Sequence, residues 1–559
     1  MRPVRIANCS GFYGDRLAAA REMVEGGPID VLTGDYLAEL TMLILAKAQA
    51  KDSGLGYART FLTQVEDVIG PCLERGIKIV SNAGGLNPAG LAAAIEALGA
   101  RVAYVEGDDL RGSLGAVTPA VSGKPVSANA YLGGWGIAAA LAAGADVVVT
   151  GRVTDASLVV GPAAWWHGWG PTEWDALAGA VVAGHVIECG PQATGGNYAF
   201  LDEITDRRYP GFPIAEVAED GSSVITKHPG TGGLVSVGTV TAQLLYEIDR
   251  AEYVGPDVVS RFDTIHLDQV GPDRVRISGV VGAPPPPDLK VGTVRLAGFR
   301  NATTFVLTGL DIPQKAALVR DQVEQALGDQ RPAEVDWTLA RTDHADADTE
   351  EAASALLHLS VRDPSADPVG RAFSRVPIEL ALASYPGFHV TAPPADASPY
   401  GVFTASTVPQ SDVDHVAVLP HGTRVRVPAP PTRPLVPVGG FWQAPVGSGP
   451  TRRVPLGTIA GARSGDKGGR ANIGVWFRTE AAYRWFSRWL TRDRLHELLP
   501  EVAGLSSYVV QLPNLLAVNI VVDGILGEGV AASTRFDPQG KALGEWLRCR
   551  LVDIPEELL

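Results

Sequence analysis

The chain has 559 residues, 46% of them hydrophobic and 19% charged, a composition that suits roughly two to four globular domains. Its formal net charge of -15 argues against general nucleic-acid binding, which needs a basic face. The four cysteines form no CxxC pair, which argues against a zinc knuckle or a thioredoxin-like site. No secretory signal and no apolar run long enough for a membrane span are visible, so we expect a cytoplasmic protein.

Short apolar runs alternate with helical patterns over about the first 150 residues. This alternation predicts a doubly wound, Rossmann-like parallel sheet as the core of an N-terminal domain at 1–255. In such sheets ligands bind beyond the carboxyl ends of the strands, so the residues that follow strands are the first candidates for a site. The expected strands are 4–7, 29–32, 77–80, 102–105 and 146–150.

The strand at 77–80 runs into a glycine turn and then a small-residue helix. Asn87 is a good N-cap and Pro88 suits the first helical turn. A helix start of this kind offers N–H groups to an anion, although a plain tight turn explains the pattern equally well. The substrate-binding candidates here are Asn82, Gly84, Gly85 and Asn87.

The loops after the first two strands carry polar side chains. Ser10 and Asp15 follow the first strand and are substrate-binding candidates, but neither GxGxxG nor GxxxxGK[ST] is present, which leaves little support for NAD or ATP. Asp35 and Glu39 follow the second strand, four residues apart. They could be an acid/base pair or metal ligands, whereas the alternative is a capping Asp and a solvated Glu.

The strand at 146–150 ends in Gly151-Arg152-Val-Thr-Asp155, the second strong candidate. Arg152 could bind a substrate carboxylate through two parallel hydrogen bonds. The alternative is a structural ion pair between Arg152 and Asp155. We take Asp35, Arg152 and Asp155 as the catalytic candidates.

Two later loops add further substrate-binding candidates. The first, 188–197, is polar and contains Asn197. The second, His228-Pro-Gly-Thr-Gly232-Gly233, could point N–H groups at an anion. A packed histidine and an ordinary turn are the alternatives for His228 and its glycines.

Beyond residue 255 the pattern becomes a mixed α+β region, 256–427, expected to pack on the first domain and to include a helix at 352–359. A Pro-rich linker at 428–452 leads to a tail domain at 453–559, whose interleaved strands and helices suit a ferredoxin-like fold. A loop is expected at 462–472, where glycines and basic residues form a plausible phosphate cradle. Its candidate residues are Ser464, Asp466, Lys467 and Arg470.

Several of these motifs occur together in one known family. The chain resembles the acyclic terpene utilisation protein A family in the segments 8–15, 33–39, 82–88, 151–155, 188–197 and 228–233, and its tail segment 464–474 resembles the ferredoxin-fold domain often fused to that family. The family is named for a gene cluster that degrades citronellol and geraniol through branched acyl-CoA thioesters, which the cluster carboxylates, hydrates and cleaves. The resemblance implies a role in such catabolism.

We therefore expect a non-redox lyase or hydratase that acts on a CoA thioester or a related carboxylate, with CoA as part of the substrate. One alternative is a lyase assisted by a divalent metal such as Mg²⁺, held by Asp35, Glu39 or Asp155. Another is a non-catalytic subunit that binds or assembles acyl-CoA enzymes. The linker and a tryptophan-rich patch around residues 165–174 suggest a homo-oligomer.

Overall fold

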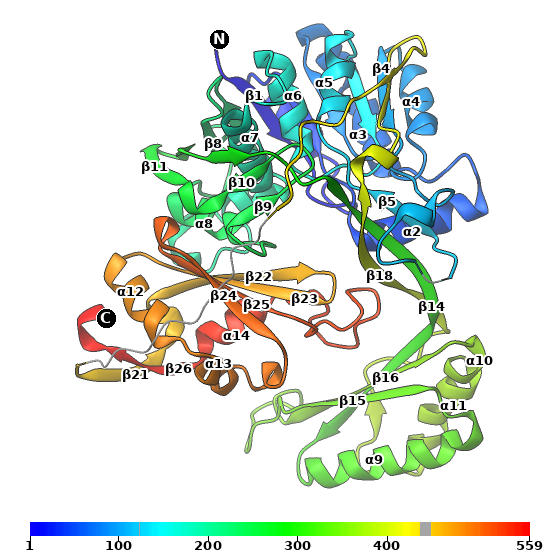
Figure 1. Ribbon diagram of the computed structural model, residues 1–559. Coiled ribbons are helices and arrows are strands. Elements are labelled where there is room, and N and C mark those ends of the chain that lie inside the picture. The colour runs from blue at the N-terminus through cyan, green and yellow to red at the C-terminus, as the bar shows by residue number, and fades with distance from the viewer. Residues whose placement is uncertain (122, 436–448) are drawn as a thin grey trace. The chain divides into compact units, whose positions relative to one another are not determined.

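The computed structural model describes residues 1–121, 123–435 and 449–559. The chain forms two compact units: the larger comprises 1–294, 403–530 and 537–559, and the smaller comprises 295–402 and 531–536. The chain passes between the units within the long strands β14 (Asp288–Thr308) and β18 (Ser398–Pro409) (Figure 1). Most of the predicted linker, 436–448, lies outside the described residues. None of the helices in the described ranges combines the length and the hydrophobicity of a membrane-spanning segment.

The centre of the large sheet is parallel, in the order β1-β2-β3-β6-β4. Alternate residues of a strand point to opposite faces, and both faces are covered: Val148 of β6 belongs to one apolar core, and Val147 and Val149 belong to another. The strands are β1 (Val4–Asn8), β2 (Val31–Gly34), β3 (Lys78–Ser81), β4 (Val102–Glu106) and β6 (Val147–Thr150). The helices between and after them are α1 (Ala19–Glu25), α2 (Glu39–Lys51), α3 (Arg59–Arg75), α4 (Pro88–Glu96), α5 (Trp135–Ala142) and α6 (Ser157–His167).

Antiparallel strands extend this centre at both edges, so the sheet is mixed and has eleven strands. A tight turn at 218–222 joins β7 and β8, and this short connection makes the pair antiparallel beside β1. The predicted doubly wound, Rossmann-like sheet is therefore not confirmed for the domain as a whole. The added strands are β7 (Pro213–Val217), β8 (Ser223–Lys227), β11 (His266–Gly271), β12 (Arg274–Ser278), β19 (Val416–Val418) and β20 (Arg424–Arg426).

Smaller elements complete the N-terminal part of the larger unit. Helix α7 (Trp174–Ile187) is almost wholly buried, and α8 (Val237–Leu244) follows it. The remaining strands are β5 (Ser127–Ala130), which pairs with β14, and the three-stranded sheet of β9 (Glu252–Val254), β10 (Val259–Arg261) and β13 (Val281–Ala283).

The C-terminal domain contains a four-stranded antiparallel sheet in the order β22-β23-β25-β24, with helices beside it (Figure 1). The loop predicted at 462–472 is wrong: β22 and β23 form a hairpin with only Gly468 and Gly469 at its turn. The other glycines of this segment lie within strands, where a neighbouring segment packs closely against them. A Cβ on Gly465, for example, would lie 2.5 Å from the Tyr246 ring and would clash with it. The elements are β21 (Thr451–Pro455), β22 (Ala460–Lys467), β23 (Arg470–Phe477), α12 (Glu480–Trp489), α13 (Arg492–Leu498), β24 (Ser507–Leu512), β25 (Ala517–Val522), α14 (Leu543–Cys549) and β26 (Leu551–Pro555).

The smaller unit packs helices on an antiparallel sheet. The helix predicted at 352–359 is wrong, since this segment belongs to β16, in which alternate residues (Ala355, Leu357, Leu359 and Val361) are buried. That period of two is the pattern of a strand. The other elements are α9 (Ile312–Leu327), β15 (Glu334–Ala340), β16 (Ser354–Asp363), α10 (Ala366–Val369), α11 (Arg371–Glu379) and β17 (His389–Val390).

Candidate active site

A cavity of about 740 Å³ opens at the carboxyl ends of the parallel strands. Its wall includes Asp15 after β1, Asp35 after β2, and Arg152 and Asp155 after β6. The C-terminal domain supplies the facing residues Asp466, Lys467 and Lys541. The position agrees with the general rule for open α/β sheets.

Asp35 is buried in this wall, and a neighbouring strand end holds it in place. Asn82 Nδ2 donates to Asp35 Oδ1 at 2.6 Å, while Asn82 Oδ1 accepts from the Tyr36 amide at 2.8 Å. Burial raises the pKa of Asp35 well above its usual value, and the nearby Asp155 carboxylate raises it further. Burial therefore favours the protonated form of Asp35.

Arg152 is the buried cation of the cluster. Its Nη1 donates to the Leu37 carbonyl at 2.7 Å and lies 3.1 Å from Asp155 Oδ1. The guanidinium also lies over the ring of Tyr131, 4.2 Å from the centroid. Asp155 Oδ1 has this charge contact but no hydrogen-bond partner within the described ranges, so it is available to accept a proton from a ligand.

Glu188 stands at the C-terminal end of α7 and lines the same cavity. Its Oε1 lies 3.3 Å from His185 Nδ1, and its Oε2 is buried without a partner among the described residues. Burial raises the pKa of Glu188, as does the charge of Asp155, whereas burial lowers the pKa of His185 to about 4. His185 is thus neutral at neutral pH, and burial favours the protonated form of Glu188 beside Asp155.

Asp108 fixes the backbone from which Arg152 projects. Its Oδ2 accepts from the Arg152 amide and from Asn129 Nδ2, both at 2.7 Å. Burial raises the pKa of Asp108 to about 7. Because this native value lies above that of the unfolded chain, about 3.9, the contribution of Asp108 to the free energy of unfolding is complete at about pH 4 and is lost as the pH rises to about 7.

Replacing Asp108 by Asn is therefore expected to make stability less sensitive to pH. Between about pH 5 and about pH 7 the variant should lose less unfolding free energy than the wild type, by roughly 1 kcal/mol per pH unit, because it carries no proton to release. Urea unfolding at the two pH values measures the difference. Asp268→Asn, at an exposed position, is the matched control. Equal pH slopes in Asp108→Asn and wild type would show that Asp108 titrates normally.

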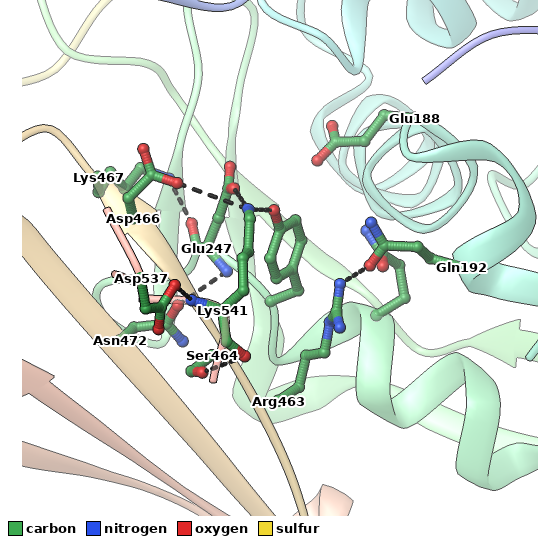
Figure 2. Close-up of polar contacts among 12 residues, drawn as sticks. Glu188, Gln192, Glu247, Arg463, Ser464, Asp466, Lys467, Asn472, Asp537 and Lys541 are labelled. Atoms are coloured by element: carbon green, nitrogen blue, oxygen red, sulfur yellow. Dashed lines mark hydrogen bonds and ion pairs between the residues drawn. The ribbon is translucent and has the colours of Figure 1, made fainter. Parts of the chain in front are cut away.

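The C-terminal domain closes the cavity through a charged cluster (Figure 2). Lys541 Nζ lies 3.2 Å from Glu247 Oε1 and 3.5 Å from Asp466 Oδ1, and it is hydrogen-bonded to the Tyr246 hydroxyl. Burial alone would raise the pKa of Glu247, but the charge of Lys541 and the hydrogen bond from Tyr246 lower it. Glu247 is therefore an ionised group on this side of the cavity.

Two buried asparagines of the C-terminal sheet hold the segment that carries Glu247, whose φ is +55°. Asn472 Nδ2 donates to the Leu245 carbonyl at 2.7 Å and to Asn519 Oδ1 at 2.8 Å, and its Oδ1 accepts from the Glu247 amide at 2.9 Å. Asn519 Nδ2 donates to the Ile248 carbonyl at 3.2 Å. The backbone bend at Glu247 thus depends on the tail domain.

Asn472→Ala is expected to reduce the free energy of unfolding by about 1–3 kcal/mol, since it leaves the Leu245 carbonyl and the Glu247 amide buried without partners. Chemical denaturation would measure the loss. The same variant should weaken ligand binding in the cavity, because Glu247 would lose its fixed orientation. An unchanged unfolding midpoint would show that water or a backbone shift replaces the amide.

The structure gathers only some of the predicted site residues at the cavity. Its wall contains Asp15, Asp35, Glu39, Arg152, Asp155, Asn197, Asp466 and Lys467. Asn82 supports Asp35 from behind, and Ser10 donates to the Phe12 carbonyl at 2.9 Å in the loop after β1. Arg470 is paired with Asp523 (2.6 Å) and lines a neighbouring cavity.

The remaining predicted site residues lie in the larger unit but away from the cavity wall. Asn87 caps α4 by accepting from the Gly90 amide, and a Cβ on Gly84 would lie 2.5 Å from the Thr150 carbonyl oxygen. His228 Nε2 lies 2.9 Å from the Met23 carbonyl oxygen, and Ser464 Oγ donates to the Lys541 carbonyl. None of the following lines the cavity: Gly84, Gly85, Asn87, His228, Gly232, Gly233 and Ser464. A ligand role for them stays a prediction.

The wall residues that were not predicted from the sequence include Tyr131, Glu188, Glu247, Lys290 and Lys541. Glu188 is the first residue of the polar, glycine-containing segment 188–197 and lies at the end of α7. Its position in that segment could have identified it as a candidate. The others reach the cavity from elements distant in the chain, and their local sequences contain no motif.

The carboxyl groups do not fit the metal alternative. No group of three or more His, Cys, Asp or Glu side chains in the described part of the chain is arranged to hold a metal ion. Asp155 Oδ1 already lies beside Arg152, and Asp35 Oδ1 already accepts from Asn82, so these oxygens have partners other than a cation. We therefore derive no step through a metal.

The fold and cavity define a mixed α/β protein with large sheets and a fused ferredoxin-like domain. The model of the acyclic terpene utilisation family protein AtuA matches residues 4–419, and that of the AtuA ferredoxin-like domain matches residues 454–553. The chain therefore belongs to the acyclic terpene utilisation protein AtuA family, which confirms the resemblance and the ferredoxin-like tail. No curated protein matches the chain.

Proposed function

We propose that the chain is an acid–base enzyme of acyl-CoA catabolism, a lyase or hydratase that acts without redox chemistry on a CoA thioester or a related carboxylate. One observation carries the proposal: three carboxyl groups, Asp35, Asp155 and Glu188, surround the buried cation Arg152 at a cavity wall. We also take the five parallel strands as a Rossmann-like unit, because helices join them and core side chains cover both faces.

The environments of the three carboxyl groups suggest different roles. Asp155 faces Arg152 and has an oxygen free to take a proton, so it is the proposed base. Asp35 and Glu188 have raised pKa values and are the proposed proton donors. A buried carboxyl group with a raised pKa is a common general acid in enzymes.

In a dehydration, Asp155 would take the proton next to the thioester carbonyl, and Asp35 or Glu188 would give a proton to the leaving hydroxyl. The C–H and C–O bonds break, a C=C bond forms, and water leaves. Arg152 has five N–H donors, so it can hold the carbonyl oxygen as charge develops there. The reverse sequence is hydration, and cleavage of a 3-hydroxyglutaryl-type thioester would use the same base on the hydroxyl.

The test is mass spectrometry of the purified protein with a panel of branched 3-hydroxyacyl-, enoyl- and glutaryl-CoA thioesters, each with and without EDTA. We expect the gain or loss of one water, or release of an acetate unit, unaffected by EDTA. Turnover that EDTA abolishes and Mg²⁺ restores would replace this mechanism with the metal-assisted one. If every thioester returned unchanged, the enzyme proposal would fail, and thermal stabilisation by free CoA would then indicate a binding subunit.

A further inference from the structure

A second cavity, of about 570 Å³, adjoins the first within the larger unit. The two share the wall residues Asp249, Lys290 and Lys467, so they meet at these side chains. The second cavity is also lined by Phe403, by the β22–β23 turn at 468–469 and by Arg470. A ligand longer than the first cavity could therefore extend past the two lysines.

Lys290 and Lys467 differ from other cations at these walls. Arg152, Lys541 and Arg470 each have a carboxylate within 3.5 Å. Among the described residues, no carboxylate oxygen lies within the 4.0 Å ion-pair distance of either lysine ammonium. In a chain with a net charge of -15, two cations without ion pairs at one place indicate a position for an anionic ligand.

Neighbouring groups hold both side chains in place. Lys290 Nζ lies 4.6 Å from the ring centroid of Tyr131, and Lys467 Nζ lies 5.4 Å from that of Tyr253. Lys467 also donates to the Glu247 carbonyl. Burial lowers the pKa of Lys467, and the charge of Lys290 lowers it further, so the two ammonium groups are near enough to repel. An anion between them would relieve that repulsion.

The backbone of the hairpin turn adds neutral donors. Gly468 has a φ of +67°, and within the described ranges neither its amide nor that of Gly469 donates a hydrogen bond. Turn amides of this kind form anion-binding concavities. The carboxyl group of Glu39 also lies near Lys290, but burial raises the pKa of Glu39 to about 7, so protonation can remove its charge when an anion enters.

We propose that Lys290 and Lys467, with the amides of the 468–469 turn, form a phosphate-binding subsite at the junction of the two cavities. A substrate would then span both, with its reacting end toward Arg152 and a phosphate between the lysines. A phosphate suits the site because two ammonium point charges can share its several oxygens. The placement of the reacting end rests on the proposed function, whereas phosphate binding does not.

The test is isothermal titration calorimetry of the full-length protein with inorganic pyrophosphate and, separately, with CoA. We expect Lys290→Met and Lys467→Met each to weaken pyrophosphate binding by about tenfold, because each removes a charge-assisted contact. Lys51→Met, at an exposed position on α2, should bind as the wild type does. Circular dichroism would check folding, and Lys290→Gln and Lys467→Gln would replace any methionine variant that fails to fold.

Absence of pyrophosphate binding by the wild type, or equal affinity in the lysine variants, would overturn the subsite. CoA binding at least about tenfold tighter than pyrophosphate, and dependent on both lysines, would support a phosphate carried by a larger substrate. If pyrophosphate and CoA bound with equal affinity, the idea of a substrate that spans both cavities would be wrong. The subsite would then be one for free phosphate. Because binding needs no turnover, failure of the thioester panel and failure of the subsite are separate results.

Discussion

Replacing Asp155 by Asn is expected to lower kcat by about 10²–10⁴-fold, the usual contribution of a positioned general base. Asparagine has nearly the same shape as aspartate but cannot accept the proton that Asp155 would take. The neutral amide also removes the charge that raises the pKa of Asp35 and of Glu188, so both proton donors would become more acidic. The measurement is kcat on the thioester that the panel identifies, together with the unfolding midpoint.

Asp268→Asn is the matched control, because this exposed residue lies on the edge strand β11 away from the cavity wall. Its kcat should equal that of the wild type. Full turnover in Asp155→Asn would exclude Asp155 as the base. A fallen unfolding midpoint in Asp155→Asn would instead assign it a structural role as the partner of Arg152.

The second large effect is expected from Arg152→Met, which should cost about 3–5 kcal/mol of unfolding free energy as well as turnover. The methionine would leave Asp155 beside Asp35 and Glu188 without a buried cation, and the Leu37 carbonyl would lose its donor. Urea unfolding near neutral pH measures the stability loss.

Arg152→Lys separates charge from geometry in the same position. A lysine restores the positive charge but not the planar fork, so stability should recover more than turnover. Arg276→Met, at an exposed position of β12, is the control for loss of an arginine. If Arg152→Met were as stable as this control, the carboxyl cluster would not depend on a buried cation.

The catalytic candidates could be predicted from the sequence because a local pattern locates them. Asp35 follows β2 and Arg152 follows β6, both short buried strands of a parallel sheet centre. The carboxyl ends of such strands meet at one edge, so residues distant in the sequence come together there. The same rule could not find Glu247 or Lys541, which reach the cavity through the packing of the tail domain.

Glycine-rich segments were harder to interpret, because glycine serves both turns and close packing. A Cβ on Gly233 would lie 2.3 Å from the Thr194 carbonyl oxygen, and one on Gly474 would lie 2.4 Å from the Leu245 Cβ. At both glycines, a neighbouring segment packs so closely that no side chain would fit. The sequence shows the missing side chain but not the neighbour, which is why a hairpin at 460–477 was predicted in part as a loop.

The central claim is that Asp35 and Glu188 serve as proton donors in the cavity where Asp155 is the proposed base. Infrared difference spectroscopy of the purified protein at neutral pH tests it without a substrate, since a protonated carboxyl has its own C=O stretching band. We expect this band to weaken in Asp35→Asn and in Glu188→Gln and to be unchanged in Asp268→Asn. A wild-type band that neither Asp35→Asn nor Glu188→Gln weakens would mean that both groups are ionised, and this would contradict their assignment as proton donors.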